Sequence, residues 1–417
     1  MKVSAHSSSS SVPTPVNLRL LSAIALLMLC GHAAATDTQA WRVNGFLSQA
    51  AFYTSDNNFA GDSNDGISTD FNEAGLNASL NPWKWLRISG QVLARNAGNY
   101  DNGELRTDYF NFDIQFWNNA DTRMGMRLGR VRNVYGLYNE TRDVAHTRPG
   151  ITLPGVIYLE QARDLNISRD GIGFYSDVFT SYGTLALEAG AGRARVSDRL
   201  VEEALMAPAD GIEPDDAQIR MLTLNWEDAD GHWRFALSQY QITSDVSADL
   251  SAFIAGLNLQ LDGDFKLDTS TISVQYSTEQ WQLTAEWLRF TYDLDFTYVN
   301  RRYPGEGAYL QYTWIFSPAW QLFGRYEYGV MDRHHRSGSA MEEFCGTALD
   351  KFCSPRSKGF RHESSIGVRW DINSQWMVAT EAHYVEGAMG LPYSDNPEPA
   401  DIATYWTLFG IELAFRF

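Results

Sequence analysis

Charged side chains recur at alternate positions along the chain, and these are the residues that could do chemistry. Arginine supplies most of the cations, because only five of the 33 basic residues are lysines. An arginine keeps its charge at any relevant pH and donates hydrogen bonds in fixed directions. Arginines that face carboxylates across water would set up a field that admits polar solutes and rejects apolar ones, although an ordinary ion pair is an equal alternative for any single residue. The candidates are Arg87, Arg95, Asp113, Arg123, Arg127, Glu286, Arg325, Glu327, Arg369, Glu381 and His383.

Motifs for catalysis and metal binding are absent from the sequence. There is no His-x-x-x-His, no Gly-x-Ser-x-Gly and no paired-cysteine metal motif. We therefore expect no enzymatic activity, no cofactor and no metal site. The net charge of −18 also argues against nucleic acid as a partner, because phosphates need a basic face.

The first 35 residues have the form of a secretory signal peptide. Lys2 and Arg19 are followed by an apolar run over 20–30, which is too short to span a bilayer. The small residues Ala33-Ala34-Ala35 then form a cleavage signature, and lipidation of Cys30 is the less favoured alternative. We expect residues 1–35 to be removed during export.

The remainder, 36–417, is expected to be a single domain, because it contains neither a linker nor a repeat of 20 to 50 residues. Its only cysteines are Cys345 and Cys353, eight positions apart in a polar stretch. In an exported protein this spacing favours a disulfide that closes a small loop over two free thiols.

Apolar and polar residues alternate with period two from Trp41 to Phe417, in stretches of about ten residues. That is the length that a tilted membrane strand needs, and we count about sixteen strands. They are expected at 41–53, 71–81, 84–96, 107–117, 123–131, 171–179, 184–196, 217–227, 232–244, 268–278, 281–292, 305–316, 320–331, 359–372, 376–388 and 401–417.

The connections between these strands alternate between short and long. Seven short turns include 118–122 and 317–319, and the eight long connections include 97–106, 132–170 and 293–304. This alternation predicts an antiparallel up-and-down β-barrel with short periplasmic turns on one rim and long extracellular loops on the other.

The positions of the tryptophans distinguish a membrane barrel from a soluble one. Ten of the 13 tryptophans lie within a few residues of the short turns or open the first strand. Indole prefers the lipid headgroup region, because its ring is apolar while its N–H needs a polar partner. The expected fold is therefore a transmembrane all-β barrel.

Together, the signal peptide, the alternating strands, the tryptophan girdle and the C-terminal Ala414-Phe-Arg-Phe417 resemble a Gram-negative outer-membrane porin. Gly136-Leu-Tyr-Asn-Glu-Thr-Arg-Asp143 with Thr147-Arg-Pro149 is similar to a loop of porin-like proteins without an assigned substrate. The resemblance implies contact with outer-membrane lipid and lipopolysaccharide, recognition of Phe417 by the barrel-assembly machinery, and a homotrimer.

The longest connection, 132–170, is the third long loop, which folds into the lumen in the porins that this chain resembles. Its many apolar residues favour that position, and the alternatives are a loop that caps the mouth of the barrel or packs on a neighbouring subunit. The charged candidates at this constriction are Glu140, Arg142, Asp143 and Arg148.

A sixteen-stranded barrel is too wide for its side chains to fill, so it leaves an aqueous lumen. The expected function is passive diffusion of small hydrophilic solutes through an arginine-lined pore with a mild anion preference. A channel selective for a sugar, a phosphate-like anion or a carboxylate is one alternative, and a structural or adhesive barrel is another.

Overall fold

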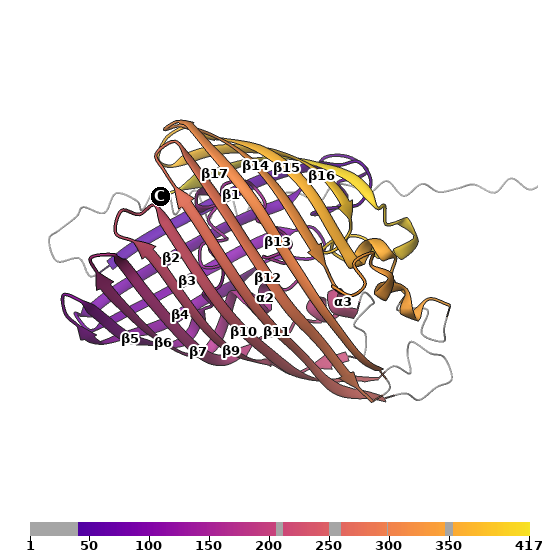
Figure 1. Cartoon of the computed structure of the whole chain (residues 1–417), viewed down its shortest axis with the longest axis horizontal. Helices are drawn as coiled ribbons and strands as arrows, with labels where there is room; N and C mark the ends of the chain where they lie inside the picture. The colour runs from indigo at the N-terminus through magenta and orange to yellow at the C-terminus, as the bar shows by residue number, and fades with distance from the viewer. Residues whose placement is uncertain (1–40, 206–211, 250–259, 298, 347–352) are drawn as a thin grey trace, which may run out of the picture. The chain divides into compact units, whose positions relative to one another are not determined.

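The computed structural model describes residues 41–205, 212–249, 260–297, 299–346 and 353–417, and the expected signal peptide lies outside them. Seventeen strands form one antiparallel sheet that closes on itself (Figure 1). The strands are β1 (Trp41–Thr54), β2 (Ser68–Trp83), β3 (Leu86–Ala97), β4 (Asn102–Asn118), β5 (Thr122–Arg132), β6 (Ser168–Thr180), β7 (Gly183–Ala194), β8 (Ile212–Pro214), β9 (Ala217–Asp228), β10 (Trp233–Asp249), β11 (Gln260–Ser277), β12 (Trp281–Phe296), β13 (Val299–Ser317), β14 (Trp320–Val330), β15 (Phe360–Asp371), β16 (Trp376–Gly387) and β17 (Tyr405–Arg416).

The wall has sixteen positions, because β8 and β9 follow one another along the same edge of β10. β7 pairs with β9 and β8 pairs with β10, whereas every other strand pairs with its sequence neighbours. β17 pairs with β1 in the register Phe46↔Arg416 and closes the ring. The terminal residue completes the closure: the amide of Phe417 donates to the Gly45 carbonyl at 3.0 Å, and the amide of Gly45 donates in return at 3.1 Å. The predicted sixteen-stranded barrel is confirmed.

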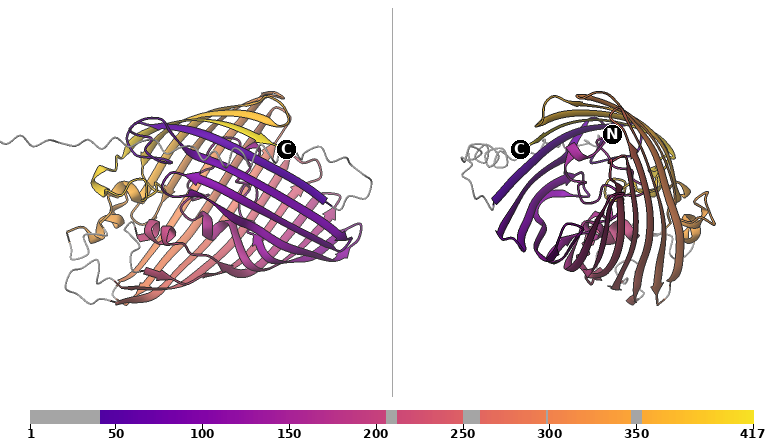
Figure 2. Two further views of the ribbon diagram at one scale, coloured as in Figure 1. Left: turned by 180° about the vertical axis from the view of Figure 1, so that it is seen from behind. Right: turned by 60° about the vertical axis from the view of Figure 1, so that its left-hand side comes forward.

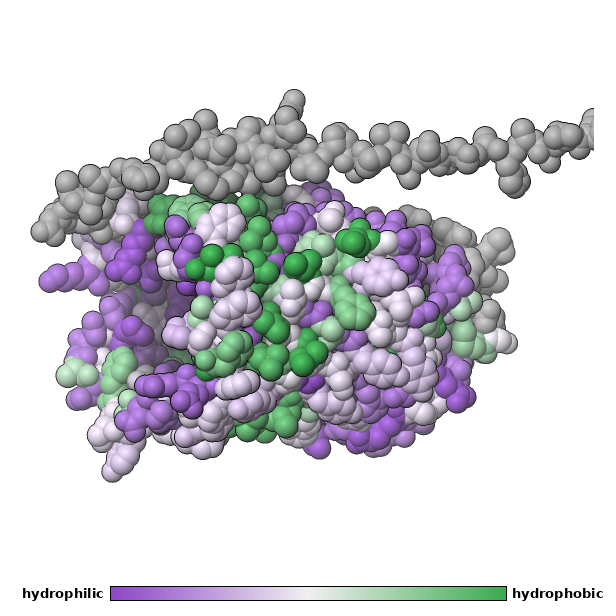
Figure 3. Space-filling model, turned by 90° about the horizontal axis from the view of Figure 1, so that it is seen from above, coloured by the Kyte–Doolittle hydropathy of each residue, from purple (hydrophilic) through white to green (hydrophobic). Residues whose placement is uncertain are grey.

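Burial alternates along each strand with the pattern expected of a membrane wall. On β17 the exposed side chains are apolar, with Phe409 at 52% and Ile411 at 51%, whereas the inward Glu412 is fully buried. A soluble barrel would expose the polar residue and bury the apolar ones. Apolar side chains gather across the middle of one face, and hydrophilic ones gather toward both ends (Figure 3).

Aromatic side chains mark the rim that carries the short turns. The indole rings of Trp83 and Trp85 stack with their centroids 5.4 Å apart, and those of Trp320 and Trp370 stack at 5.3 Å. These rings are exposed on the outer wall, where they suit the headgroup region of a bilayer.

Two of the predicted long connections are short. β3 ends at Ala97 and β4 begins at Asn102, so the connection expected over 97–106 comprises only residues 98–101. β12 continues to Phe296 and β13 begins at Val299, which leaves only 297–298 of the connection expected over 293–304. The prediction limited strands to membrane thickness, but hairpins can extend their ladder beyond a bilayer as long as their side chains favour strand geometry.

The helical segments are short and lie in the connections. They are η1 (Ala145–Thr147), α2 (Arg163–Ile167), α3 (Asp198–Leu205), η3 (Ser339–Phe344), η5 (Arg356–Gly359) and η6 (Pro399–Asp401). None of the described helices is long and apolar enough to cross a membrane.

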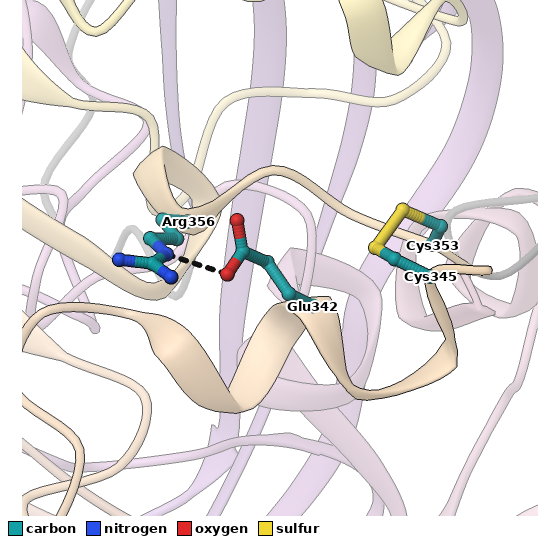
Figure 4. The surroundings of a disulfide bond; sticks show 4 residues. All are labelled: Glu342, Cys345, Cys353 and Arg356. Atoms are coloured by element: carbon teal, nitrogen blue, oxygen red, sulfur yellow. Dashed lines mark hydrogen bonds and ion pairs between the residues drawn. A yellow bond between two sulfur atoms is a disulfide. The ribbon is translucent and has the colours of Figure 1, made fainter.

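The connection between β14 and β15 carries the two cysteines. Cys345 and Cys353 form a disulfide, with their Cα atoms 4.6 Å apart. Nearby, Arg356 on η5 pairs with Glu342 on η3 at 2.5 Å (Figure 4). The disulfide and the ion pair both join the two sides of this connection.

A candidate constriction across the barrel lumen

Residues 133–167, between β5 and β6, form what we call the lumen segment, and they lie inside the ring of strands (Figure 2, right). Its apolar side chains are buried, and Ile151 and Tyr158 are completely so. They pack against inward residues of the far wall, including Tyr240 on β10 and Tyr309 on β13. A connection so rich in apolar groups needs such cover, and the inner wall provides it.

Glu286 on β12 anchors the part of the segment around Leu137 and Tyr158. Its carboxylate accepts hydrogen bonds from the Leu137 amide at 2.9 Å and from the Tyr158 hydroxyl at 2.7 Å. The wall residues Ser273 and Tyr309 donate to the same carboxylate at 2.6 and 2.8 Å. A buried carboxylate needs several donors, and half of those on Glu286 come from the segment.

A second anchor lies on β14 and β16. Glu381 accepts the amides of Ile151 and Thr152 at 2.9 and 3.0 Å, and Arg325 donates to the Thr152 carbonyl at 3.1 Å. Glu327 accepts the Val156 amide at 3.3 Å. These wall side chains bind backbone groups, so the path of the main chain is fixed independently of the side chains that it carries.

His383 contacts Glu381, the carboxylate of this second anchor. Its Nδ1 lies 2.5 Å from Glu363 and its Nε2 lies 3.0 Å from Glu381. Glu363 also pairs with Arg361 on the same strand. The imidazole therefore bridges two buried carboxylates and fixes the orientation of the one that holds the segment.

A third anchor holds the tip of the segment. Arg369 on β15 donates to the carbonyls of His146 and Arg148, both at 2.9 Å. The guanidinium of Arg148 in turn donates to Glu412 on β17 at 3.1 Å and to Glu73 on β2 at 3.3 Å. The tip thus crosses the lumen from β5 and β6 to the strands at which the barrel closes.

Ion pairs hold the base of the segment near its origin. Asp143 lies 2.5 Å from Arg132 and also pairs with Arg163. Burial alone would raise the pKa of Asp143, but the two guanidiniums hold that pKa well below its usual range. All three groups are fully ionised at neutral pH, so the base is held by permanent charges.

A second group of charges joins the segment to β3. Glu160 pairs with Arg142 in the segment and lies 2.7 Å from Arg95 on the wall. Burial opposes ionisation of Glu160, yet Arg142 and Arg95 lower its pKa to about 2. Arg95 is itself buried and also reaches Glu73 at 2.9 Å.

The wall formed by β3 to β6 is different near the short turns, because the arginines that point inward there remain open to water. Arg87 is exposed, and the side chains of Arg123 and Arg127 are 49% and 29% exposed. Arg123 pairs with Asp177 at 2.5 Å, and Arg127 pairs with Glu188 at 2.7 Å and approaches Asp113 at 3.7 Å. Across from them, Glu140 is an exposed residue of the segment.

The space-filling view shows the molecule hollowed at the end that carries the short turns (Figure 3). The exposed Arg87 and Arg123 lie on β3 and β5, whereas the segment is hydrogen-bonded to the wall of β12 to β17. The candidate constriction therefore lies between Glu140 on the segment and the arginines on β3 and β5.

The predicted site residues fall into two sets. The structure places Arg95, Glu286, Arg325, Glu327, Arg369, Glu381 and His383 around the lumen segment, where they hold it, together with its own Arg142, Asp143 and Arg148. It places Arg87, Asp113, Arg123, Arg127 and Glu140 at the open side. A single field across the lumen, made by all of these charges, was expected, but most of the carboxylates are used to bind the segment.

Sequence reasoning missed Glu73, Glu363 and Glu412 as parts of this site. Each lies on the inward face of its strand and is almost fully buried. Glu363 lies two positions from Ser365 and six from Arg369 on the same face of β15. The alternation therefore already predicted that the side chain of Glu363 points inward. Among the described residues, no group of three or more metal-binding side chains could hold a metal ion.

Solved structures with the same architecture are outer-membrane proteins. The trimer form of OmpT from Vibrio cholerae is 12% identical, with a TM-score of 0.55 over 91% of this chain and all of that one. An anion-selective porin from Comamonas acidovorans is also 12% identical, with a TM-score of 0.55 and the same coverage. This chain has the fold of outer-membrane porins.

The outer-membrane channel DcaP of Acinetobacter baumannii is a further neighbour of this porin fold, 11% identical with a TM-score of 0.51 over 92% of this chain and 99% of that one. Neither a protein-family model nor a curated protein sequence matches the chain.

Proposed function

We propose that this protein is a porin-like channel of the Gram-negative outer membrane, through which small hydrophilic solutes diffuse passively with a mild preference for anions. One observation carries the proposal: the lumen segment is bound to the wall of β12 to β17, while Arg87 on β3 and Arg123 on β5 stay exposed to water. A wide lumen that is narrowed but not filled conducts, and exposed guanidiniums attract anions.

The selectivity rests on unequal exposure of the two signs. Many inward carboxylates, such as Glu286, Glu381 and Glu412, are buried and held by donors, whereas Arg87 and Arg123 are exposed. The half-buried Asp113 and the exposed Glu140 partly offset these cations, which is why we expect only a mild preference.

Planar-bilayer recording of the purified protein tests the proposal. We expect stepwise conductance that scales with bulk salt, and a reversal potential in a potassium chloride gradient with the sign of chloride preference. An intact barrel without conductance would contradict the channel, and strong cation selectivity would contradict the arginine-lined pathway.

A channel selective for one solute is the second candidate, and one cavity favours it. The cavity lies beside Ile151 and Leu153 of the segment, with Phe71 and Trp406 among its apolar lining and Arg361 and Glu363 among its charged lining. Apolar groups beside a few charged ones are typical of a site for a small organic solute. Concentration-dependent block of the current by a small aromatic carboxylate, without block by acetate, would favour this candidate.

The remaining expectations complete the proposal. We infer export through a cleaved signal peptide over 1–35, recognition of Phe417 by the barrel-assembly machinery, contact with lipid and lipopolysaccharide, and no enzymatic activity. We also propose a homotrimer, which the printed trimer form of OmpT supports by analogy. Native mass spectrometry of the extracted protein tests the assembly.

A further inference from the structure

Residues 388–396, which follow β16, fold inward over the lumen segment. The carbonyl of Gly390 accepts a hydrogen bond from the Gln161 side chain of the segment. The carbonyl of Met389 accepts one from Arg361 on β15 at 3.3 Å. Met389 is also buried in the apolar cluster that covers the lumen segment. This stretch therefore lies across the inside of the barrel mouth.

The neighbouring connections bind the same stretch at its near side. Lys358 on η5 is buried and donates to the Leu391 carbonyl at 2.7 Å. Asp395 accepts the amide of Gly61, in the connection after β1, at 3.3 Å, and the amide of Asn99, in the connection after β3, at 2.9 Å. The position of the stretch is thus fixed by the connections after β1, β3 and β14.

The helix α3, in the connection after β7, meets the stretch at its far side. Glu203 accepts the amides of Tyr393 and Ser394 at 2.6 and 3.0 Å, and the Ser394 hydroxyl donates to the same carboxylate at 3.1 Å. Val201 of α3 is buried, and Leu200 packs against the apolar cluster of the lumen segment. Because all three of these hydrogen bonds end on one carboxylate, the contact depends strongly on one side chain.

The two partners in this contact come from opposite sides of the barrel. Around the ring, the strands β10 to β15 separate the two connections in one direction, and the strands β1 to β6 separate them in the other. The helix α3 lies at the end of the barrel away from the C terminus, where the long connections are (Figures 1 and 2). The contact between Glu203 and residues 393–394 therefore spans the mouth from one side to the other. We call α3 together with residues 388–396 the mouth bridge.

We propose that the mouth bridge is a second size filter of the channel, and that Glu203 is the residue that closes it. A chain that crosses an opening divides it into smaller ones, and the width of an opening limits the solutes that pass. The cavity beside Ile151 has Gly390 and Pro392 of the bridge in its lining, so the bridge lies directly against the space next to the lumen segment. This inference rests on the proposed channel function.

Swelling of liposomes that contain the protein, in sugars of two sizes, tests the filter. Glu203→Ala removes the acceptor of the Tyr393 and Ser394 amides. We expect it to raise the swelling rate in a trisaccharide, relative to the rate in a pentose, by about threefold. Glu398→Ala removes an exposed carboxylate from the connection after β16 and is the matched control, which should keep the wild-type ratio. A ratio that stays the same or falls in Glu203→Ala would overturn the proposal.

A covalent link across the same contact gives the opposite change. In Glu203→Cys/Ser394→Cys the bridge is expected to be open until a short bis-thiosulfonate joins the two thiols. The link should appear as a faster-migrating band on a non-reducing denaturing gel, and it should lower the trisaccharide rate to the wild-type value or below. Failure of the link to form would show that α3 and residue 394 do not meet, and a link without loss of trisaccharide flux would equally refute the filter.

The pentose rate distinguishes failure of this inference from failure of the proposed function. If wild-type protein in an intact barrel passes neither sugar, the channel is refuted and the filter with it. If it passes the pentose but the ratio is the same in every variant, only the filter is refuted.

Discussion

The carboxylate of Glu381 on β16 accepts a hydrogen bond of 2.9 Å from the backbone amide of Ile151 in the lumen segment. The contact joins residues 230 positions apart, and the segment supplies only its main chain. Since the acceptor is on the wall, the constriction depends on wall residues at least as much as on its own side chains.

Glu381→Ala is expected to loosen the part of the segment around Ile151 and Thr152. The change leaves the amides of Ile151 and Thr152 without their acceptor, which costs on the order of 1–3 kcal/mol for buried donors. We expect noisier single-channel currents and a higher mean conductance. Glu386→Ala on the outer face of the same strand is the matched control, and equal behaviour of the two variants would contradict the anchor.

Reversing the charge of Arg87 is expected to lower the preference for anions. Arg87 is exposed and lies opposite Asp113 in the β3–β4 ladder, so Arg87→Glu adds a second negative charge there. We expect the chloride-to-potassium permeability ratio to fall by about threefold, which corresponds to a change of about 0.7 kcal/mol in the lumen. Arg302→Glu makes the same charge change on the outer face of β13, where the ratio should not move.

Acidification is expected to weaken the tip of the lumen segment through His146. Burial and the nearby Arg416 and Arg369 lower the pKa of His146 from its ordinary value to about 4. The unfolded chain therefore binds more protons than the folded one between about pH 6.5 and pH 4, so stability is lost as the pH falls through that range.

The thermal midpoint of the wild type should accordingly fall more between pH 7 and pH 5 than that of His146→Phe. His334→Phe in the connection after β14 is the control, and it should retain the wild-type dependence. A variant at 146 that shows the same pH dependence as the wild type would remove His146 from this role.

Reduction of the disulfide is expected to act locally. Cys345 and Cys353 close a small loop in the connection after β14, for which the chain-entropy estimate is about 2.5 kcal/mol. We expect Cys345→Ser/Cys353→Ser to be cut by external protease several times faster near η3 and η5. Its conductance should stay as in the wild type, and loss of the barrel would contradict a local role.

The sequence predicted the wall well, because period-two alternation reports directly on the two faces of a strand. The strand ends at the extracellular side were less predictable, since nothing in the ladder of β12 and β13 stops at the membrane surface. The inward direction of Glu286, Arg325 and Glu381 followed from the same alternation.

The partners of those side chains did not follow from the sequence. Glu381 and Ile151 meet only after the segment has crossed the lumen, and alternation within one strand carries no information about such long-range contacts. The acids were therefore expected to be open pore charges, whereas their hydrogen bonds are made to the segment.

The crossing of the lumen by the segment also has a mechanical consequence. A barrel of this width is a ring only one sheet thick, and nothing in its ladders opposes flattening of the cross-section. The segment connects β5 to β6 and is hydrogen-bonded to β12, to β14, and to β15 through β17. It therefore acts as a strut across the ring. Lateral pressure on one side of the barrel is thereby transmitted through the segment to the opposite side.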